Sequence, residues 1–236
     1  RPPRGRAAGH MDLQGGSRIA RIAGTFALLA TCLAASHGWS DQLFPGDYLP
    51  SYKRAAEHGE RKAQYLLGLR YERGLPGEPD FAAAAHWYAK AAEQGMRLAA
   101  FRLALIYQLG RGAPRNPVLA AKWYTRAAEE GLAEAQFNLG YLYERGIGVP
   151  VDGKSSVLWY RRAAIQGVHE AYRHLGMLYA AGRSVERDDA KALFWLSLVP
   201  ENPEVEAIRR LVRERGGPAA TEASQNLREE WNTQRR

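Results

Sequence analysis

The sequence predicts an all-α fold, a right-handed α/α superhelical solenoid built from helix-turn-helix repeats of 36 residues. The first observation is a tryptophan column at that spacing: Trp87, Trp123, Trp159 and Trp195. The second is a set of Ala, Leu, Tyr and Gly columns with the same spacing. A period of about 20–50 residues is typical of tandem arrays in which each unit buries its apolar face against its neighbours.

The first helix of each unit is predicted from apolar residues four positions apart. In the first unit these are Ala63, Leu67 and Tyr71, which fall on one stripe of a helix. Gly74 then ends the helix, because glycine tolerates the left-handed conformation common at helix C-termini. The same four positions recur in the later units as Ala99, Leu103, Tyr107 and Gly110; as Ala135, Leu139, Tyr143 and Gly146; and as Ala171, Leu175, Tyr179 and Gly182.

The second helix of each unit is predicted to begin after a short polar residue. These residues are Asp80, Asn116, Asp152 and Asp188, whose side chains accept hydrogen bonds from otherwise unpaired backbone N–H groups. Pro117 suits the first helical position, where a missing N–H costs nothing. A glycine closes the second helix of the first three units, and Pro203 takes its place after the fourth, so we expect units at about 59–94, 95–130, 131–166 and 167–200.

A small residue follows each member of the Leu column. These residues are Gly68, Ala104, Gly140 and Gly176. A glycine inside a helix costs about 1 kcal/mol relative to alanine, so its recurrence indicates that another helix approaches closely there. We expect the tryptophan of the second helix to pack at this position. The tryptophans are therefore interpreted as holding the array together rather than as binding a ligand.

The repeat pattern extends beyond the four clear units. Residues 48–58 match the end of a unit and are expected to form a helical cap, so that the solenoid spans 48–200. Downstream, Ala207, Leu211 and Trp231 continue the Ala, Leu and Trp columns. Residues 201–236 are therefore predicted to form a degenerate fifth unit and C-terminal cap.

The third unit carries the pattern AxxxLGxxYxxG, a loop with an aspartate, and WYxxAAxxG, from Ala135 to Gly167. This pattern resembles the Sel-one-like repeat, a relative of the tetratricopeptide repeat. The resemblance covers about residues 48–233. It implies an adaptor, scaffold or regulator that binds other proteins, often in the bacterial cell envelope. Departures from the pattern leave the loop geometry open: the loop of the first unit reads GLPGEPD, and the fourth unit has Ser184 for the loop glycine and Leu196 for the tyrosine.

The sequence favours a binding protein over an enzyme. It shows no metal-binding helix motif, phosphate-binding glycine loop or nucleophile motif, so we expect no catalytic residue, no metal and no cofactor. Some relatives in the resembled family are cysteine-rich and linked to β-lactam binding or hydrolysis, whereas this chain has one cysteine, Cys32. A hydrolase acting on cell-wall or β-lactam substrates stays as an alternative. A lipid-anchored scaffold of envelope polysaccharide machinery is a second alternative.

The N-terminal segment predicts export. Residues 1–10 precede Met11 and are interpreted as an upstream remnant, and residues 11–37 as a signal peptide. Arg18 and Arg21 precede an apolar stretch, residues 22–35, that is shorter than the roughly 20 residues of a membrane span. Cleavage after Ser36 or Gly38 gives a periplasmic or secreted protein.

Two other outcomes for this segment stay open. One is an uncleaved anchor. The other is a lipoprotein, because the residues before Cys32 faintly resemble a bacterial lipobox. Contact with a membrane is expected only through the signal peptide or through a lipid on Cys32.

The charge pattern argues against a nucleic-acid partner. The net charge is +8, and without residues 1–36 the chain keeps 28 Lys and Arg against 24 Asp and Glu, a net charge of +4. The charges alternate in sign along the predicted helices, which is typical of a solvated, salt-bridged surface.

A protein partner is expected on the first helices, opposite their packing stripe. At 100° per residue, the apolar and aromatic residues on that side outnumber what a solvated face warrants. They form the predicted concave groove for an extended peptide or a helix. The groove residues are Tyr65, Leu69, Phe101, Leu105, Phe137, Tyr141, Arg173 and Met177. The alternative is that tight curvature packs these side chains against neighbouring first helices.

Overall fold

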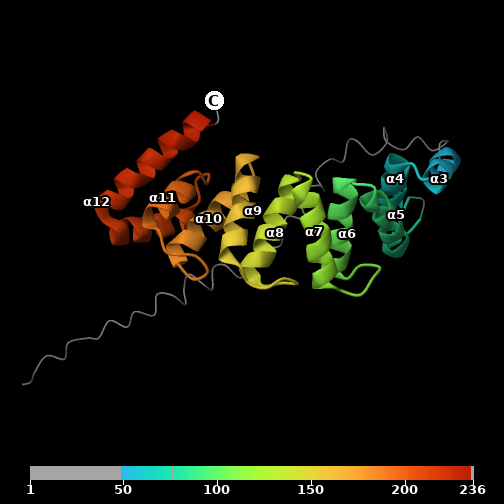
Figure 1. Ribbon diagram of the computed structural model, residues 1–236, viewed down its shortest axis with the longest axis horizontal. Coiled ribbons are helices and arrows are strands. Elements are labelled where there is room, and N and C mark those ends of the chain that lie inside the picture. The colour runs from blue at the N-terminus through green and yellow to red at the C-terminus, as the bar shows by residue number, and fades with distance from the viewer. Residues whose placement is uncertain (1–48, 76, 235–236) are drawn as a thin grey trace, which may run out of the picture.

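The computed structural model describes residues 49–75 and 77–234, and within them the chain forms ten helices and no strand. Figure 1 shows these helices side by side in chain order from α3 to α12. The expected upstream remnant, the signal peptide and the lipid site at Cys32 lie outside the described residues. Among the described helices, none combines the length and apolar character needed to cross a membrane.

The helices alternate between the two positions of the repeat. The first helices are α4 (Arg61–Glu72), α6 (Arg97–Leu109), α8 (Ala133–Arg145) and α10 (His169–Ala181). The second helices are α5 (Phe81–Glu93), α7 (Pro117–Glu129), α9 (Gly153–Ile165) and α11 (Asp189–Ser197). Helix α3 (Leu49–Glu57) precedes them and α12 (Pro203–Gln234) follows. Each helix packs against the next one along the chain, which confirms the predicted α-helical solenoid.

Local sequence signals set the helix ends. The predicted N-caps are confirmed, because each of these side chains accepts a hydrogen bond from a backbone N–H two or three residues further on. They are Asp80, Asn116, Asp152 and Asp188. Pro117 is the first residue of α7. Three first helices end at a left-handed glycine, namely Gly110, Gly146 and Gly182.

In the second to fourth units, the loop inside the unit rests on the start of the second helix of the preceding unit. A Cβ added at Gly112 would lie closer than 3.0 Å to the backbone of Phe81, and one added at Gly148 would do the same to Pro117. In the fourth unit the loop residue is Ser184, and the glycine has moved to its contact partner, Gly153. One glycine of the pair is therefore kept, which explains how the array accepts a serine in this loop.

In the first and third units the residue that packs on the small-residue column is the tyrosine that follows the tryptophan, and in the fourth unit it is Leu196, which follows Trp195. A Cβ added at Gly68 would lie 2.7 Å from the ring of Tyr88, and one added at Gly140 would lie 2.8 Å from the ring of Tyr160. Both tyrosines are fully buried. The expectation that the tryptophan occupies this position was therefore wrong.

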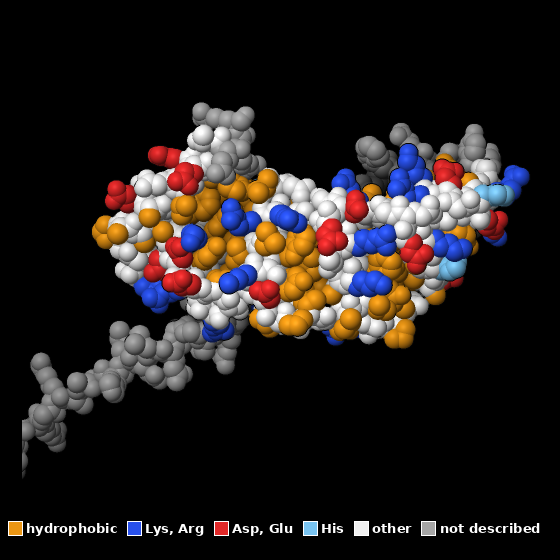
Figure 2. Space-filling view, viewed as in Figure 1, with side chains coloured by type: hydrophobic (Ala, Val, Ile, Leu, Met, Phe, Trp, Pro, Cys, Tyr) orange, Lys and Arg blue, Asp and Glu red, His pale blue; other side chains and the backbone are white. Residues whose placement is uncertain are grey.

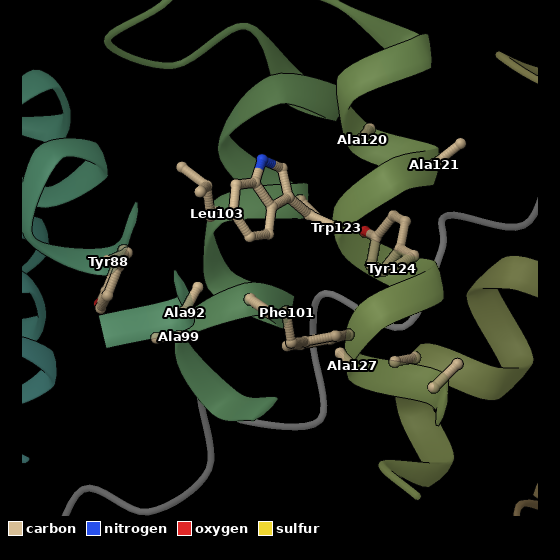
Figure 3. Close-up of a cluster of buried hydrophobic side chains, with 14 of the residues drawn as sticks. Tyr88, Ala92, Ala99, Phe101, Leu103, Ala120, Ala121, Trp123, Tyr124 and Ala127 are labelled. Carbon is tan, nitrogen blue, oxygen red and sulfur yellow. The ribbon is translucent and has the colours of Figure 1, made fainter. Parts of the chain in front are cut away.

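The tryptophans pack in the core beside the tyrosines, against other residues of the neighbouring first helix. Figure 3 shows the ring of Trp123 extending from α7 toward Leu103 of α6, while Tyr124 points elsewhere. Neighbouring residues on a helix differ by about 100° in direction, so only one of the pair can face the point of closest approach. Trp123 keeps 8% of its surface exposed, with the charged groups of Lys122 and Arg126 near its ring.

The C-terminal helix packs on the fourth unit. Helix α12 consists of two helical segments that meet at Gly217, whose φ of 66° and ψ of −166° are not helical. The ring of Trp231 is buried and lies 5.2 Å from that of Trp195. However, Leu211 is 52% exposed, whereas the next residue, Val212, is buried.

The predicted continuation of the Ala and Leu columns into α12 is therefore wrong by one residue. Ile208 and Val212 are buried, while Ala207 and Leu211 are exposed. The reason lies upstream, because α11 has only nine residues and α12 begins at Pro203 without the glycine turn that opens the earlier units. A one-residue shift rotates the buried side of a helix by about 100°.

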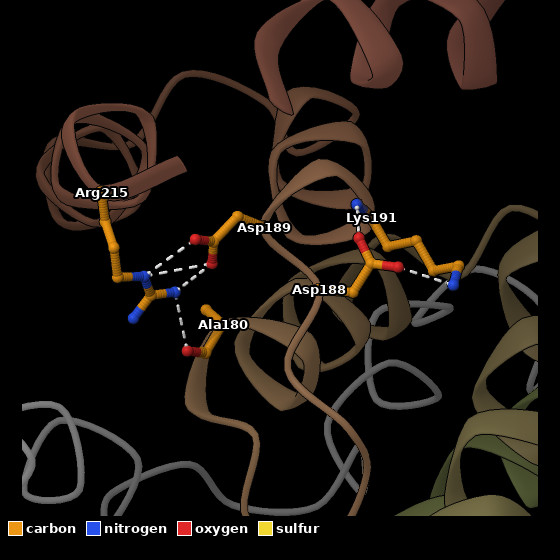
Figure 4. A network of polar contacts seen from close by, with 5 residues as sticks. All are labelled: Ala180, Asp188, Asp189, Lys191 and Arg215. Carbon is orange, nitrogen blue, oxygen red and sulfur yellow. Dashed lines mark hydrogen bonds and ion pairs between the residues drawn. The ribbon is translucent and has the colours of Figure 1, made fainter. Parts of the chain in front are cut away.

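Arg215 ties α12 to the two preceding helices (Figure 4). It stands 36 residues after Tyr179, in the tyrosine column. Its Nε donates to both carboxylate oxygens of Asp189 at the start of α11. Its Nη2 donates to the Asp189 carboxylate and, over 2.9 Å, to the backbone carbonyl of Ala180 in α10. The guanidinium group of Arg215 thus links α12 to both helices of the fourth unit.

Candidate interaction surface

The eight predicted groove residues divide into two groups. Leu69, Phe101 and Phe137 are buried, with 5%, 1% and 4% of their surface exposed. The other five are partly exposed and lie on all four first helices. We call these five the first-helix surface: Tyr65, Leu105, Tyr141, Arg173 and Met177.

The buried rings pack between helices. Phe101 lies edge-on to Tyr124, with ring centroids 5.8 Å apart. Phe137 lies 5.4 Å from Tyr160 and edge-on to His174 of the next first helix, at 5.3 Å. Packing against a neighbouring first helix is the alternative raised by the sequence. The expected exposure of Leu69, Phe101 and Phe137 is therefore corrected, and partner binding by the remaining five stays a prediction.

Polar networks cross the first and third junctions between units. At the first junction, Glu72 accepts hydrogen bonds from the Tyr88 hydroxyl and, over 3.0 Å, from Nη1 of Arg102. The three residues come from two consecutive first helices and the second helix between them. In the second unit, the Tyr124 hydroxyl donates to Gln108 of the same unit.

The third junction carries a histidine. The Tyr160 hydroxyl donates to Glu144 over 2.8 Å, and Nδ1 of His174 lies 3.0 Å from the same carboxylate oxygen. The side chains of Glu144 and His174 are 17% and 11% exposed, so this cluster reaches the surface only at its edge. The ring of Tyr141 lies edge-on to that of His174, with the ring centroids 6.1 Å apart.

Burial and charge set the protonation of these networks. Burial raises the pKa values of Tyr88, Tyr124 and Tyr160, so all three hydroxyls stay protonated donors. Burial also tends to raise the pKa of Glu144, but hydrogen bonds from His174 and Tyr160 outweigh it and hold that pKa below its usual value. Burial tends to lower the pKa of Arg102, but the Glu72 carboxylate outweighs it and raises that pKa.

The sequence reasoning did not identify these networks. The sequence does carry a pattern that could have revealed them. The two residues joined across a junction lie 30 positions apart, and each acidic residue has a basic residue at the matching position. Glu72 is matched by Arg102, and Glu144 by His174. At the second junction, two amides stand at these positions, Gln108 and the buried Asn138. Each junction thus has its own polar identity.

Metal binding receives no support from the described part of the chain. Within residues 49–75 and 77–234, no group of three or more His, Cys, Asp and Glu side chains is arranged to hold a metal ion.

Comparison with known proteins supports the repeat assignment. The Sel1 repeat family matches residues 61–96, 97–132, 133–168 and 169–198. No curated protein matches the chain. Among solved structures, a protective antigen of uropathogenic Escherichia coli with an SLR fold is similar, with 30% identity and a TM-score of 0.62. That match covers 76% of this chain and 45% of the antigen, so this chain spans less than half of the antigen's length.

A Sel1 repeat protein from Oxalobacter formigenes is also similar, with 31% identity and a TM-score of 0.57 over 74% of this chain and 85% of that protein. Both similarities extend over most of the described helices. Four consecutive family matches, together with the helix pairs described above, establish that this chain belongs to the Sel1 repeat family, whose members are generally scaffolds for protein–protein interaction.

Proposed function

We propose that the chain is an exported bacterial scaffold that binds a protein partner on the first-helix surface. One observation carries this proposal. The Ala, Leu and Tyr packing columns keep their identity from unit to unit, whereas the partly exposed residues of one column on the first-helix side are Leu105, Tyr141 and Met177 in the second to fourth units. Packing within identical units does not require such variation. A single partner that lies along several units meets a different side chain at each one.

The chemistry of this surface suits a peptide or helix with apolar anchors. Leu105, Tyr141 and Met177 are partly exposed apolar or aromatic groups at successive units. Arg145 lies 5.7 Å from the centroid of the Tyr141 ring and adds positive charge at the edge. Aromatic and aliphatic anchors with charged neighbours are typical of groove recognition. Export is supported by the sequence of residues 11–37, in which Arg18 and Arg21 precede an apolar stretch.

The test is affinity capture from the native cell envelope with matched variants. The double variant Leu105→Glu/Tyr141→Glu places two charges on the first-helix surface. The control His86→Glu/Lys122→Glu places two charges at exposed positions of the second helices. We expect a protein that is captured by the wild type and by the control and lost with the first-helix variant, while all three chains melt alike. Equal capture by both variants would contradict the proposal.

A further inference from the structure

A hollow lies where the fourth unit meets the C-terminal helix. Its volume is about 140 Å³. Phe194 and Trp195 of α11 and Trp231 of α12 give it an aromatic wall. Arg161 of α9 and Glu230 of α12 also line it, as does Lys191 of α11, which is ion-paired with Asp188, so Arg161 is the cation that this hollow offers to a ligand. A second hollow of about 370 Å³ also has Lys191 in its lining, so the two adjoin. Together they form one depression beside α9.

The outer side of α9 next to this depression is unusually apolar. Leu158 and Ile165 are 48% and 56% exposed, and they lie seven residues apart, on the same side of the helix. The first two units have polar residues at both positions. They carry His86 and Glu93 in α5, and Lys122 and Glu129 in α7. The apolar residues of α9 are therefore not a requirement of the repeat.

The same helix is unusually cationic. Helix α9 carries Lys154, Arg161 and Arg162 and no acidic residue, whereas α5 and α7 each contain a glutamate. Arg161 replaces an alanine and a threonine of the first two units, and it forms no hydrogen bond or ion pair with the described residues. Figure 2 shows hydrophobic surface interspersed with Lys and Arg over the end of the molecule that contains α9 to α12, with Asp and Glu toward its edge.

We propose that this depression and the outer side of α9 bind an acidic peptide segment that carries an aromatic or long aliphatic side chain. The apolar side chain enters the aromatic hollow, and Arg161 and Arg162 face the carboxylates on either side of it. Arginine pairs well with carboxylates because its planar group donates two parallel hydrogen bonds. The site lies mainly on α9, α11 and α12, with Tyr179 of α10 and the loop after it in its lining, and it contains none of the five residues of the first-helix surface. It is therefore separate from the first-helix surface and is tested independently of it.

The test uses the full chain and a fluorescein-labelled acidic hexapeptide with two central phenylalanines flanked by glutamates. Fluorescence anisotropy measures its dissociation constant. We expect saturable binding that weakens with added salt, because the contacts are ionic. Arg161→Glu should weaken binding by about tenfold or more, and Leu158→Lys, which restores the residue type of the second unit, should weaken it as well. Lys122→Glu, on the outer side of α7, is the matched charge control and should bind like the wild type.

Further arms keep the proposal falsifiable. If Arg161→Glu alters the melting curve, Arg161→Ala replaces it, because the first unit has an alanine at this position. A hexapeptide with serines in place of the phenylalanines should bind more weakly. Absence of saturable binding to the wild type, or equal binding by the Arg161 variants, overturns the proposal. A third result would also overturn it. If the wild type does not bind the peptide but binds phosphatidylcholine vesicles that contain phosphatidylglycerol, and if that binding depends on Arg161, the site is assigned to a lipid surface.

Discussion

Replacing Gly148 with alanine should destabilise the junction between the second and third units through two separable effects. Gly148 has a φ of 72°, a left-handed conformation that costs a residue with a Cβ about 1–2 kcal/mol. The added Cβ would also lie closer than 3.0 Å to the carbonyl oxygen of Pro117, the first residue of α7, which has little freedom to move. Overpacking of this kind costs about 1–3 kcal/mol. The expected loss in the free energy of unfolding is therefore about 2–5 kcal/mol.

Two other glycines separate the two effects. Gly167 has a φ of 89° and nothing within 4 Å of an added Cβ, so Gly167→Ala should show only the conformational cost of about 1–2 kcal/mol. Gly153 is helical, but its added Cβ would meet the backbone of Ser184, so Gly153→Ala should show the steric cost of about 1–3 kcal/mol, less up to about 1 kcal/mol for the better helix propensity of alanine.

The assay is urea unfolding followed by far-UV circular dichroism, with thermal melts as a second probe. Repeat arrays can unfold unit by unit, so the three variants are compared by their whole transitions rather than by one midpoint. A Gly148→Ala chain that is no less stable than Gly167→Ala would refute the nesting of each loop on the preceding second helix.

Four further outcomes are expected. Ser156→Ala should stabilise the chain by about 1 kcal/mol in urea unfolding, because the Ser156 hydroxyl is fully buried without a hydrogen bond to the described residues and the other units have alanine there; a less stable variant would contradict this. Glu144 has a lowered pKa in the folded chain, so its contribution to stability should be present above its ordinary value of 4.5 and lost as the pH falls through the folded value. The stability difference between wild type and Glu144→Gln should therefore shrink in acid, and a difference that does not change with pH would disprove it. Arg215→Ala should cost about 1–2 kcal/mol and speed hydrogen exchange in α12, because it removes the hydrogen bonds to Asp189 and Ala180; unchanged exchange would count against the clamp. Intact mass of protein from the native envelope should show cleavage after Ser36 or Gly38, whereas a diacylglyceryl group on Cys32 would indicate the lipid-anchored alternative.

The repeat and its helix ends could be predicted because they depend on local chemistry. Asp80 and Asn116 act as caps through bonds to backbone groups within three residues, and Pro117 fits a position defined by the helix itself. These interactions need no knowledge of distant contacts. The tail shows where this reasoning ends. Its 36-residue column suggested Leu211, although the spacing of Val205, Ile208 and Val212 already indicated the stripe that is buried.

The candidate surface was harder to predict, because helical periodicity gives the direction of a side chain but not what covers it. Phe137 was expected to lie opposite its packing stripe, yet its ring packs on Tyr160 of the same unit and on His174 of the next first helix. The choice of Tyr160 rather than Trp159 at the close approach to Gly140 likewise depends on how one helix is rotated against its neighbour. Both facts depend on contacts between helices, which the pattern along one helix does not specify.

The most direct test of partner binding on the first helices is site-specific photo-crosslinking in cells. A benzoylphenylalanine is placed at Tyr141 on the first-helix surface or at the exposed Lys122 on the second helices. The account predicts a discrete adduct with one partner protein from position 141 and none from position 122, lost when Leu105→Glu is added to the chain. An adduct that forms equally from both positions, or only from position 122, would contradict it.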